Sequence, residues 1–240
     1  QRYKPGIIGV TGSVGKTSTK EAIFAVLSQE RRVRRSAGNF NNELGLPLAI
    51  LGEWDEIKGL FFWPKVILIS LVRIIFKPSY PELLALEYGA DKPGDIKYLL
   101  EIAKPQISVV TAVGEIPPHI EFYSGPEAIA REKSKIIEIL PSTGFAVLNY
   151  DDVAVLEMRE RTRAHITTFG FSEGAEVRIS NFENRTDDGV PEGVSFKLEY
   201  GGSFVPVKMK GIFGRAPAYA AAAAAAVGLI FGLNLVKISE

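Results

Sequence analysis

Apolar positions in the first part of the chain follow two alternating patterns. Short runs of apolar, often β-branched residues predict buried strands over 6–10, 83–87, 107–113 and 145–149. Apolar residues that recur every three to four positions predict amphipathic helices over 17–29, 93–103 and 127–140. Strands that alternate with such helices predict an α/β fold, in which a mostly parallel sheet is flanked by helices on both faces.

The pattern changes after residue 151. Apolar and polar residues alternate over 165–171, 176–182, 194–200 and 204–209, which predicts strands, and Gly201 and Gly202 suit a hairpin turn between the last two. We therefore expect a small antiparallel annex over 151–213 on a parallel core over 1–150. An Ala-rich run predicts a closing helix over 217–233, whose small side chains permit close packing; low complexity is the alternative.

Residues 59–76 form an apolar run almost as long as a membrane span. Pro64 interrupts the run, and Lys65, Ser70, Arg73 and Lys77 fall on one side of a helical wheel. Three hypotheses are a membrane span, a helix at a membrane surface, and a helix packed on the protein's own surface. We favour the third and keep peripheral membrane contact through 59–77 as an alternative.

Composition restricts the class of protein. The 28 basic and 28 acidic residues cancel, which removes the electrostatic case for a nucleic-acid binder. The lack of cysteine excludes disulfides, thiolate zinc sites and a Cys nucleophile within 1–240, and it fits a cytoplasmic protein. The chain starts without the apolar segment of a signal peptide and without Met, so we expect a piece of a longer protein.

The strongest chemical motif is TGSVGKTS at 11–18, which ends a predicted strand and opens a predicted helix. Its glycines allow backbone N–H groups to surround phosphate oxygens, Lys16 can neutralise the β- and γ-phosphates, and the Thr17 hydroxyl can ligate Mg²⁺. The strict P-loop pattern lacks its first glycine, because Val10 stands there and Gly9 lies one residue early. The motif still predicts a P-loop-type nucleoside triphosphate site.

Four blocks, in this order, resemble the Mur ligases, which are ATP-dependent amide-bond ligases of cell-wall synthesis. They are TGSVGKTSTK (11–20), GNFNNELGLP (38–47), EYGADKPGDIKYLLEIA (87–103) with the following Lys104 and Pro105, and LNYDD (148–152). The second and third are most similar to the branch that adds D-alanyl-D-alanine to UDP-N-acetylmuramoyl-tripeptide. The blocks span most of the chain, and the resemblance implies the central ATP-binding domain, with the N-terminal UDP-binding and C-terminal domains lying outside 1–240.

The resemblance also implies roles for individual residues. Glu87 is implied as a Mg²⁺ ligand and His119 as a ligand of a second metal ion; a strand-end surface carboxylate and a solvated loop histidine are the alternatives. Lys133 is implied to be carbamylated, which would turn a cation into an oxygen ligand, whereas Lys133 and Lys135 could both be solvated. The implied sets are Lys16, Lys133 and His119 for catalysis; Gly12, Ser13, Val14, Gly15, Lys16, Thr17, Ser18 and Asn149 for ATP; Thr17, Glu87, His119 and Lys133 for metal; and Asn39, Asn42 and Glu43 for the substrate side.

One block departs from the family pattern. Relatives often carry His and Asn or Gln near the adenine, whereas this chain has GRAPAY at 214–219, which leaves backbone groups or stacking on Tyr219 to hold the base. The resemblance implies a monomeric enzyme that uses ATP and two Mg²⁺ ions to form an acyl phosphate, and that joins D-Ala-D-Ala to the UDP-muramyl-tripeptide. The alternatives are a Mur-like ligase with another acceptor and a non-catalytic nucleotide-binding module.

Overall fold

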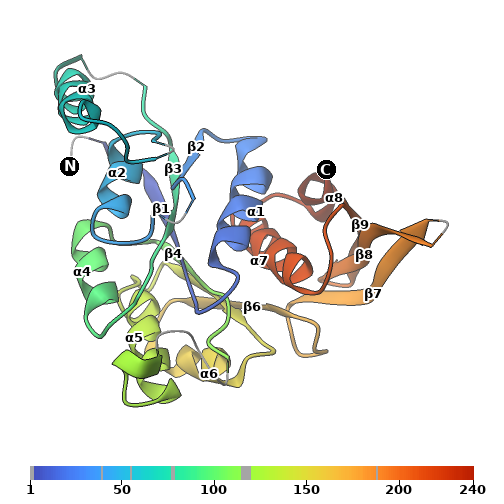
Figure 1. The fold of residues 1–240 in the computed structure, drawn as a ribbon. Helices are drawn as coiled ribbons and strands as arrows, with labels where there is room; N and C mark the ends of the chain where they lie inside the picture. The colour runs from blue at the N-terminus through green and yellow to red at the C-terminus, as the bar shows by residue number, and fades with distance from the viewer. Residues whose placement is uncertain (1–2, 39, 55, 77–78, 115–119, 188) are drawn as a thin grey trace.

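The computed structural model describes residues 3–38, 40–54, 56–76, 79–114, 120–187 and 189–240. In this part of the chain, nine strands form one sheet in the order β2-β3-β1-β4-β5-β6-β7-β8-β9 (Figure 1). The strands are β1 (Gly6–Thr11), β2 (Val33–Arg35), β3 (Leu83–Glu87), β4 (Ile107–Val110), β5 (Phe145–Asn149), β6 (His165–Gly170), β7 (Val177–Asp187), β8 (Val190–Tyr200) and β9 (Ser203–Lys210). Neighbours from β2 to β7 pair in parallel, which confirms the predicted fold class.

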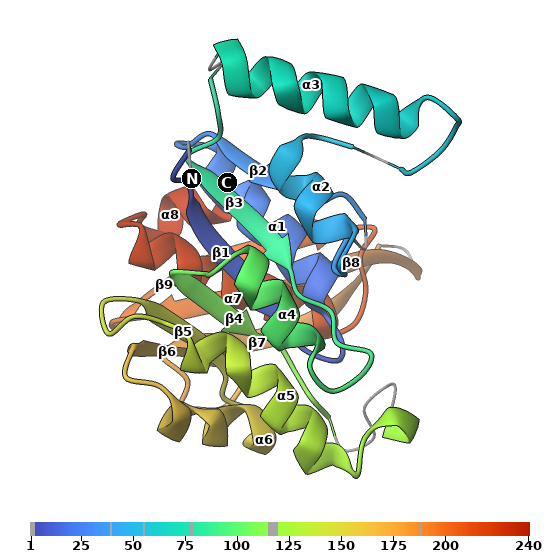
Figure 2. The ribbon, with the colours of Figure 1, turned by 90° about the vertical axis from the view of Figure 1, so that its left-hand side faces the viewer.

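Helices cover both faces of this sheet (Figures 1 and 2). One face carries α1 (Lys16–Ser28), α7 (Ala216–Ile230) and α8 (Leu235–Ser239), and the other carries α2 (Gly45–Leu51), α4 (Asp95–Ile102), α5 (Pro126–Glu138) and α6 (Val153–Leu156). Strand β3 shows why both faces need cover: Leu83 and Ala85 enter the core beneath α1, while Leu84 and Leu86 enter the core on the opposite side. A strand with both faces buried requires a run of apolar residues without alternation.

The direction in which successive strands are added to the sheet reverses between β1 and β4. After β1 the connections lead through α1 to β2 at the edge, whereas after β4 they lead through α5 to β5 on the other side. Loops that leave two neighbouring parallel strands in opposite directions open a crevice at the carboxyl ends of the strands, where ligands of such sheets bind. The segments that follow β1, β3, β4 and β5 meet at this edge.

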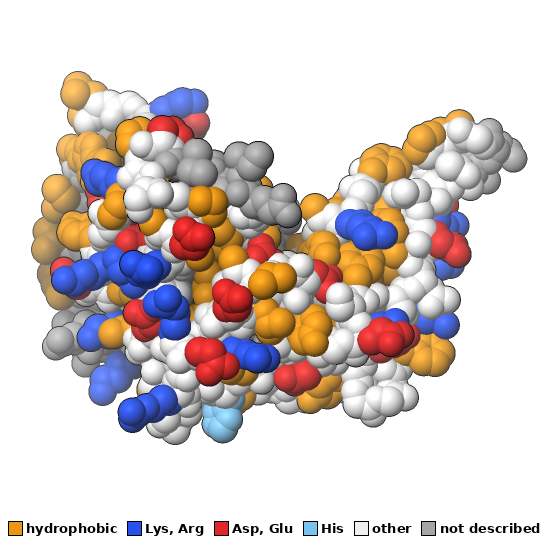
Figure 3. Space-filling model, turned by 90° about the horizontal axis from the view of Figure 1, so that it is seen from below, with side chains coloured by type: hydrophobic (Ala, Val, Ile, Leu, Met, Phe, Trp, Pro, Cys, Tyr) orange, Lys and Arg blue, Asp and Glu red, His pale blue; other side chains and the backbone are white. Residues whose placement is uncertain are grey.

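The predicted antiparallel annex over 151–213 requires a correction. Strand β6 pairs in parallel with β5, and β7 begins in parallel with β6, so the parallel sheet continues past residue 151. Antiparallel pairing is limited to β7–β8 and β8–β9, where the hairpin at Gly201 and Gly202 lies where it was predicted. Periodicity alone does not give strand direction, because a half-buried strand alternates in either pairing. Seen from below, this ribbon projects from the main body, and apolar side chains gather in the hollow at its base (Figure 3).

The Ala-rich helix α7 is a packing element. Its run Ala222–Val227 is fully buried, and the helix lies against α1. At Gly228 the two helices come so close that an added Cβ would lie 2.9 Å from Cγ1 of the Val26 side chain. Small side chains therefore let two helices share one layer, as predicted from the alanine run.

Helix α3 (Phe62–Phe76) stands apart at one end of the molecule (Figure 2). Pro64 does not interrupt it but occupies its first turn, where a missing N–H costs no hydrogen bond. The helix contacts the body through Phe62 and Val66, which pack with Leu48 of α2, while most of its length is exposed. Peripheral membrane contact through this segment stays a prediction. Among the described residues, no helix has the length and apolarity that crossing a membrane requires.

Candidate nucleotide-binding site

The loop between β1 and α1 has the geometry of a phosphate cradle. Gly12 and Gly15 adopt φ values of 146° and 81°, which residues with a Cβ rarely adopt. The Ser13 N–H donates to the Ala112 carbonyl over 2.6 Å, and the Thr111 hydroxyl donates to the Val14 carbonyl over the same distance. The loop is thus fixed by the residues that follow β4, and the predicted succession of strand, glycine turn and helix is confirmed.

The Gly12→Ala substitution is expected to disturb this loop. A Cβ at Gly12 would overlap the Thr111 hydroxyl, and the φ of 146° is strained for alanine. Together these effects should cost about 1–3 kcal/mol of unfolding free energy. Chemical denaturation would measure the loss, with Gly59→Ala as a control, because Gly59 also has a positive φ but an added Cβ there meets nothing within 4 Å. Equal losses in the two variants would contradict a packing role for Gly12.

Two lysines converge on this loop. The Lys16 ammonium donates to the carbonyls of Gly12 and Ser13 at 3.0 and 3.2 Å, and the buried Lys133 of α5 donates to the same Gly12 carbonyl at 3.0 Å. Burial, and after it the neighbouring Lys16 ammonium, lowers the pKa of Lys133 to about 8. Burial also lowers the pKa of Lys16, against the field of Glu87. The arrangement concentrates positive charge at the point where phosphate oxygens would enter the loop.

Glu87, at the end of β3, lies beside the loop and is 1% exposed. Its Oε2 accepts a hydrogen bond from the Thr17 hydroxyl at 2.9 Å, and its Oε1 accepts one from the Asn41 amide at 2.9 Å. The Lys20 ammonium is 3.9 Å from Oε2 and balances the buried charge. The sequence singled out Glu87 and Thr17 but missed Asn41, although it belongs to the same Asn-rich block as the residues assigned to the substrate side.

The other residues assigned to the substrate side have different surroundings. Asn42 accepts hydrogen bonds from the N–H groups of Leu44 and Gly45, so its side chain stabilises the start of α2. Glu43 is exposed to solvent, and Ser18 is exposed in the first turn of α1. Asn39 and His119 lie outside the described residues. Contact of these residues with a substrate or a second metal stays a prediction, and within the described ranges no three His, Cys, Asp or Glu residues cluster as a metal site would need.

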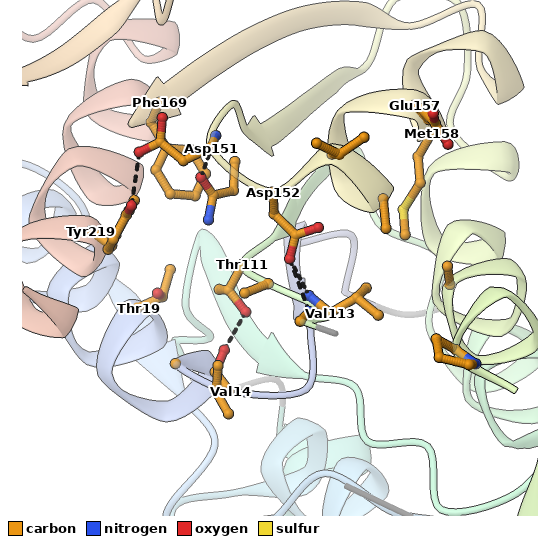
Figure 4. Close-up of a pocket in the computed structure, with 18 of the residues that line it drawn as sticks. Val14, Thr19, Thr111, Val113, Asp151, Asp152, Glu157, Met158, Phe169 and Tyr219 are labelled. Atoms are coloured by element: carbon orange, nitrogen blue, oxygen red, sulfur yellow. Dashed lines mark hydrogen bonds between the residues drawn. The ribbon is translucent and has the colours of Figure 1, made fainter. Parts of the chain in front are cut away.

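A cavity of about 1260 Å³ opens from the phosphate loop along the carboxyl ends of the strands (Figure 4). Val14 and Gly15 form one end, Asn149 and the residues after it form a wall, and Tyr219 comes from the first turn of α7. This volume is ample for a nucleotide, since sites for small molecules commonly measure about 300–1,000 Å³. The predicted ATP-binding residue Asn149 thus lies in the same cavity as the loop, and its Oδ1 accepts from the Asp151 N–H at 3.0 Å.

Two consecutive aspartates build the wall of the cavity. Asp152 accepts hydrogen bonds from the N–H groups of Val113 and Gly114 at 2.8 and 3.0 Å, and from Val155 N–H at the start of α6. Asp151 accepts from the Tyr219 hydroxyl at 2.8 Å, which fixes this ring at the cavity edge (Figure 4). Both carboxylates therefore hold segments distant in sequence together rather than standing free in the cavity.

Hydrogen bonds keep Asp151 ionised. Burial alone would raise its pKa, but hydrogen bonds from Ser172, the Phe171 N–H and Tyr219 hold the pKa below its ordinary value. The Tyr219 ring meets Phe171 edge to face at a centroid distance of 5.0 Å, and the Arg215 guanidinium lies 4.9 Å from the Phe171 ring centre. The GRAPAY block thus contributes the aromatic ring of Tyr219 to the cavity lining, where relatives were expected to have amide and imidazole groups.

Comparison with known proteins agrees with this geometry. The model of the Mur ligase middle domain matches residues 10–59 and 69–228. The UDP-N-acetylmuramoyl-tripeptide–D-alanyl-D-alanine ligase of Synechocystis is 34% identical over 191 residues, which cover 79% of this chain and 36% of that protein. The enzyme of the same name from Mycobacterium bovis is 38% identical over 160 residues, or 67% of this chain and 26% of that protein.

Solved structures give the same relationship. MurF ligase of Thermotoga maritima, determined in complex with ADP, superimposes with a TM-score of 0.76 at 28% identity and covers all of this chain and 49% of that one. The chain thus spans about a quarter to a half of the length of these relatives. The family model matches well over half of residues 1–240, including the phosphate loop, Glu87, Lys133 and Asn149. The chain therefore belongs to the Mur ligase family and contains the middle domain of that family.

Proposed function

We propose that this chain is the ATP-binding part of a ligase that adds D-alanyl-D-alanine to UDP-N-acetylmuramoyl-tripeptide. The observation that carries the proposal is the convergence of Lys16, Thr17 and Glu87 at the phosphate loop, whose residues Val14 and Gly15 line the large cavity; Thr17 and Glu87 are joined by a 2.9 Å hydrogen bond. The names of the two curated relatives, both ligases of this specificity, support the choice of substrates. Both relatives are much longer than this chain, so the complete activity is assigned to a longer polypeptide with further N- and C-terminal domains.

The residues around the loop fit the phosphates of ATP. Apart from the glycines, Ser13 contributes a buried hydroxyl for which no described group provides a hydrogen-bond partner. A phosphate oxygen would satisfy it, and Lys16 could exchange its bonds to loop carbonyls for bonds to the β- and γ-phosphates. At the base end, the Tyr219 ring, which lines the cavity and packs against Phe171, would stack on adenine, in place of the side-chain hydrogen bonds of the family pattern.

The same region fits Mg²⁺. The Thr17 hydroxyl and the Glu87 carboxylate are hard oxygen ligands that lie side by side at the loop, the donor set that Mg²⁺ prefers. When bound, Mg²⁺ would offset the negative charge of the phosphates. A second ion, held by His119 and by Lys133 as a carbamate, completes the proposal, with His119 assigned from the family resemblance alone.

Lys133 is suited to carbamylation by its environment. The reaction needs the neutral amine: its nitrogen forms a bond to the carbon of CO₂, and a proton is released to water. A pKa lowered to about 8 makes the neutral amine accessible near physiological pH. Lys135 differs, because it lies at the surface of α5 and pairs with Glu132 at 2.5 Å.

The proposed reaction has two steps. An oxygen of the tripeptide carboxylate forms a bond to the γ-phosphorus of ATP while the bond from that phosphorus to the ADP oxygen breaks. The amine of D-Ala-D-Ala then attacks the carbonyl carbon of this acyl phosphate, phosphate leaves, and the amine loses a proton. Lys16 would contribute by holding and neutralising the transferring group, since phosphoryl transfer depends mainly on positioning and charge.

The test uses the complete polypeptide as it occurs in the cell. We expect ADP release that requires both the UDP-linked tripeptide and D-Ala-D-Ala, and a pentapeptide product detected by mass spectrometry. If product forms only with a different amine or acceptor, the protein is another Mur-like ligase. If nucleotide binds but no product forms, the chain is a non-catalytic module. Fractionation of cells should find the enzyme inside the cell, in the cytoplasm or at the cytoplasmic face of the membrane, and light scattering should find a monomer in the absence of lipid.

A further inference from the structure

Helix α3 turns an apolar face toward solvent. Of its 15 residues only Phe62 and Val66 are buried, whereas Ile67, Leu71 and Ile75 are 59%, 50% and 65% exposed. At 100° per residue the outward positions form an arc without a charged residue that covers about half of the helix circumference. The exposed apolar residues of the helix are Trp63, Ile67, Leu68, Leu71, Val72, Ile74, Ile75 and Phe76, and Leu60 and Phe61 precede them.

Two polar residues of α3, Ser70 and Arg73, face the body instead. The Arg73 guanidinium donates to the Leu51 carbonyl at the end of α2, and the Tyr3 hydroxyl donates to the Arg73 carbonyl at 3.0 Å. The Ser70 hydroxyl is also turned inward and buried. A surface helix of a protein surrounded only by water has the opposite arrangement, with its apolar stripe toward the core. The outward apolar face is therefore held in position by specific bonds on the inner side.

The first half of the helix lies outside the part of the chain that the family model matches. Residues 60–68, which the family model leaves unmatched, include the first half of α3. No part of α3 enters the two cores that enclose the sheet; its apolar packing is with the small separate cluster in which Phe62 and Val66 meet Leu48, Phe40 and Trp54. The sheet and the phosphate loop thus do not need α3 for their own packing.

The charge of this segment differs from that of the whole chain. Residues 59–81 contain Lys65, Arg73 and Lys77 and no Asp or Glu, although the 240 residues together are neutral; Lys58, just before them, is paired with Glu56. Lys65 is exposed at the border of the apolar arc, with its ammonium 5.9 Å from the ring centre of Trp54. A broad apolar face bordered by cations complements a bilayer surface that carries anionic headgroups.

We propose that α3 docks this protein on the surface of an anionic lipid bilayer, with its outward apolar face inserted at the boundary between headgroups and acyl chains. The helix then lies in the plane of the interface. Its 15 residues measure about 22 Å, shorter than the roughly 30 Å hydrocarbon core. Docking leaves the ATP cavity open, because α3 lies at the end of the molecule opposite to α5 and α6, which border the cavity (Figures 1 and 2).

The charge argues for lipid over a second copy of this chain. Self-association through α3 would bring together two copies of residues 59–81, each with three basic residues and no acidic residue to pair with them. Anionic lipid instead gains about 1 kcal/mol for each basic residue near the surface. An anionic bilayer therefore fits the outward face of α3 better than a second copy of the chain.

Sedimentation with vesicles tests the proposal on the complete polypeptide. We expect binding to phosphatidylcholine vesicles that contain phosphatidylglycerol, weaker binding to phosphatidylcholine alone, and weakening by salt. The double substitution Leu71→Glu/Ile75→Glu should reduce binding at least tenfold, because two exposed apolar side chains no longer insert. The control is Val190→Glu/Val236→Glu, which changes two equally exposed apolar residues on β8 and α8.

Fluorescence of Trp63 reports directly whether α3 inserts into the bilayer. The signal should be quenched by lipids brominated in the acyl chains, and the quenching should disappear in Trp63→Phe. Equal vesicle binding by the two double variants, or no binding by the unmodified protein, would overturn the proposal. If the protein forms a dimer without lipid and Leu71→Glu/Ile75→Glu converts this dimer to a monomer, the outward face of α3 binds a second copy of the chain instead. All variants should keep their nucleotide-induced rise in melting temperature, which separates this test from that of the ATP site.

Discussion

Replacing Lys16 with alanine is expected to lower ATP turnover by the complete enzyme about 10²- to 10³-fold, the effect of removing one pre-positioned charge from a transition state. Lys16 is the first residue of α1, and its ammonium already lies against the loop carbonyls of Gly12 and Ser13. A γ-phosphate that enters the loop needs only a short movement of this side chain. The loss should appear mainly in kcat, because the charge on the transferring group develops during the reaction.

The fold should survive the Lys16→Ala change. Its ammonium bonds only to backbone carbonyls of the loop, and the glycine turn is held independently by Thr111 and Ala112. Thermal unfolding without nucleotide should therefore match the unmodified protein. Lys208→Ala, a change at an exposed lysine on β9, serves as the control and should keep full turnover. If the Lys16→Ala variant turned over ATP as fast as the unmodified enzyme, the loop would not have the phosphate-binding role assigned to it.

The parts of the site predicted correctly from the sequence are those formed by contiguous residues. The phosphate loop is a local structure, since a strand, two glycines with positive φ and a helix start all lie within residues 6–18. Glu87 was identified from the family resemblance, and its contact with Thr17 joins positions 70 residues apart. The chemistry of the loop depends on short-range order, which spacing reports directly, whereas that of Glu87 does not.

The parts that were missed depend on contacts distant in sequence. Asn41 reaches Glu87 across 46 positions and Tyr219 reaches Asp151 across 68, and no periodicity encodes such pairs. The parallel direction of β6 depends on its pairing with β5, which alternation of side chains does not reveal. The pattern of α3 shows its apolar arc, but only the packing of Phe62 and Val66 determines which side faces the body.

Replacing Lys133 with alanine is expected to lower activity on the order of 100-fold, while Lys135→Ala should retain most of it. The two lysines lie two positions apart on α5, so they point in different directions from the helix. Lys133 is 4% exposed and reaches the Gly12 carbonyl of the phosphate loop, whereas the Lys135 ammonium pairs with Glu132. The pair is thus a matched test with the same chemical change and different surroundings.

The dependence on CO₂ separates a carbamate from a merely structural lysine. Enzyme kept free of CO₂ should lose activity, bicarbonate should restore it, and the Lys133→Ala variant should not respond. Because the pKa of Lys133 is lowered to about 8, the neutral amine increases as pH rises through that value. The reactivation rate at a fixed concentration of dissolved CO₂ should therefore rise between about pH 7 and 9 and then level off. A rate independent of pH over this interval, or a larger loss in Lys135→Ala than in Lys133→Ala, would show that Lys133 is not the residue that reacts.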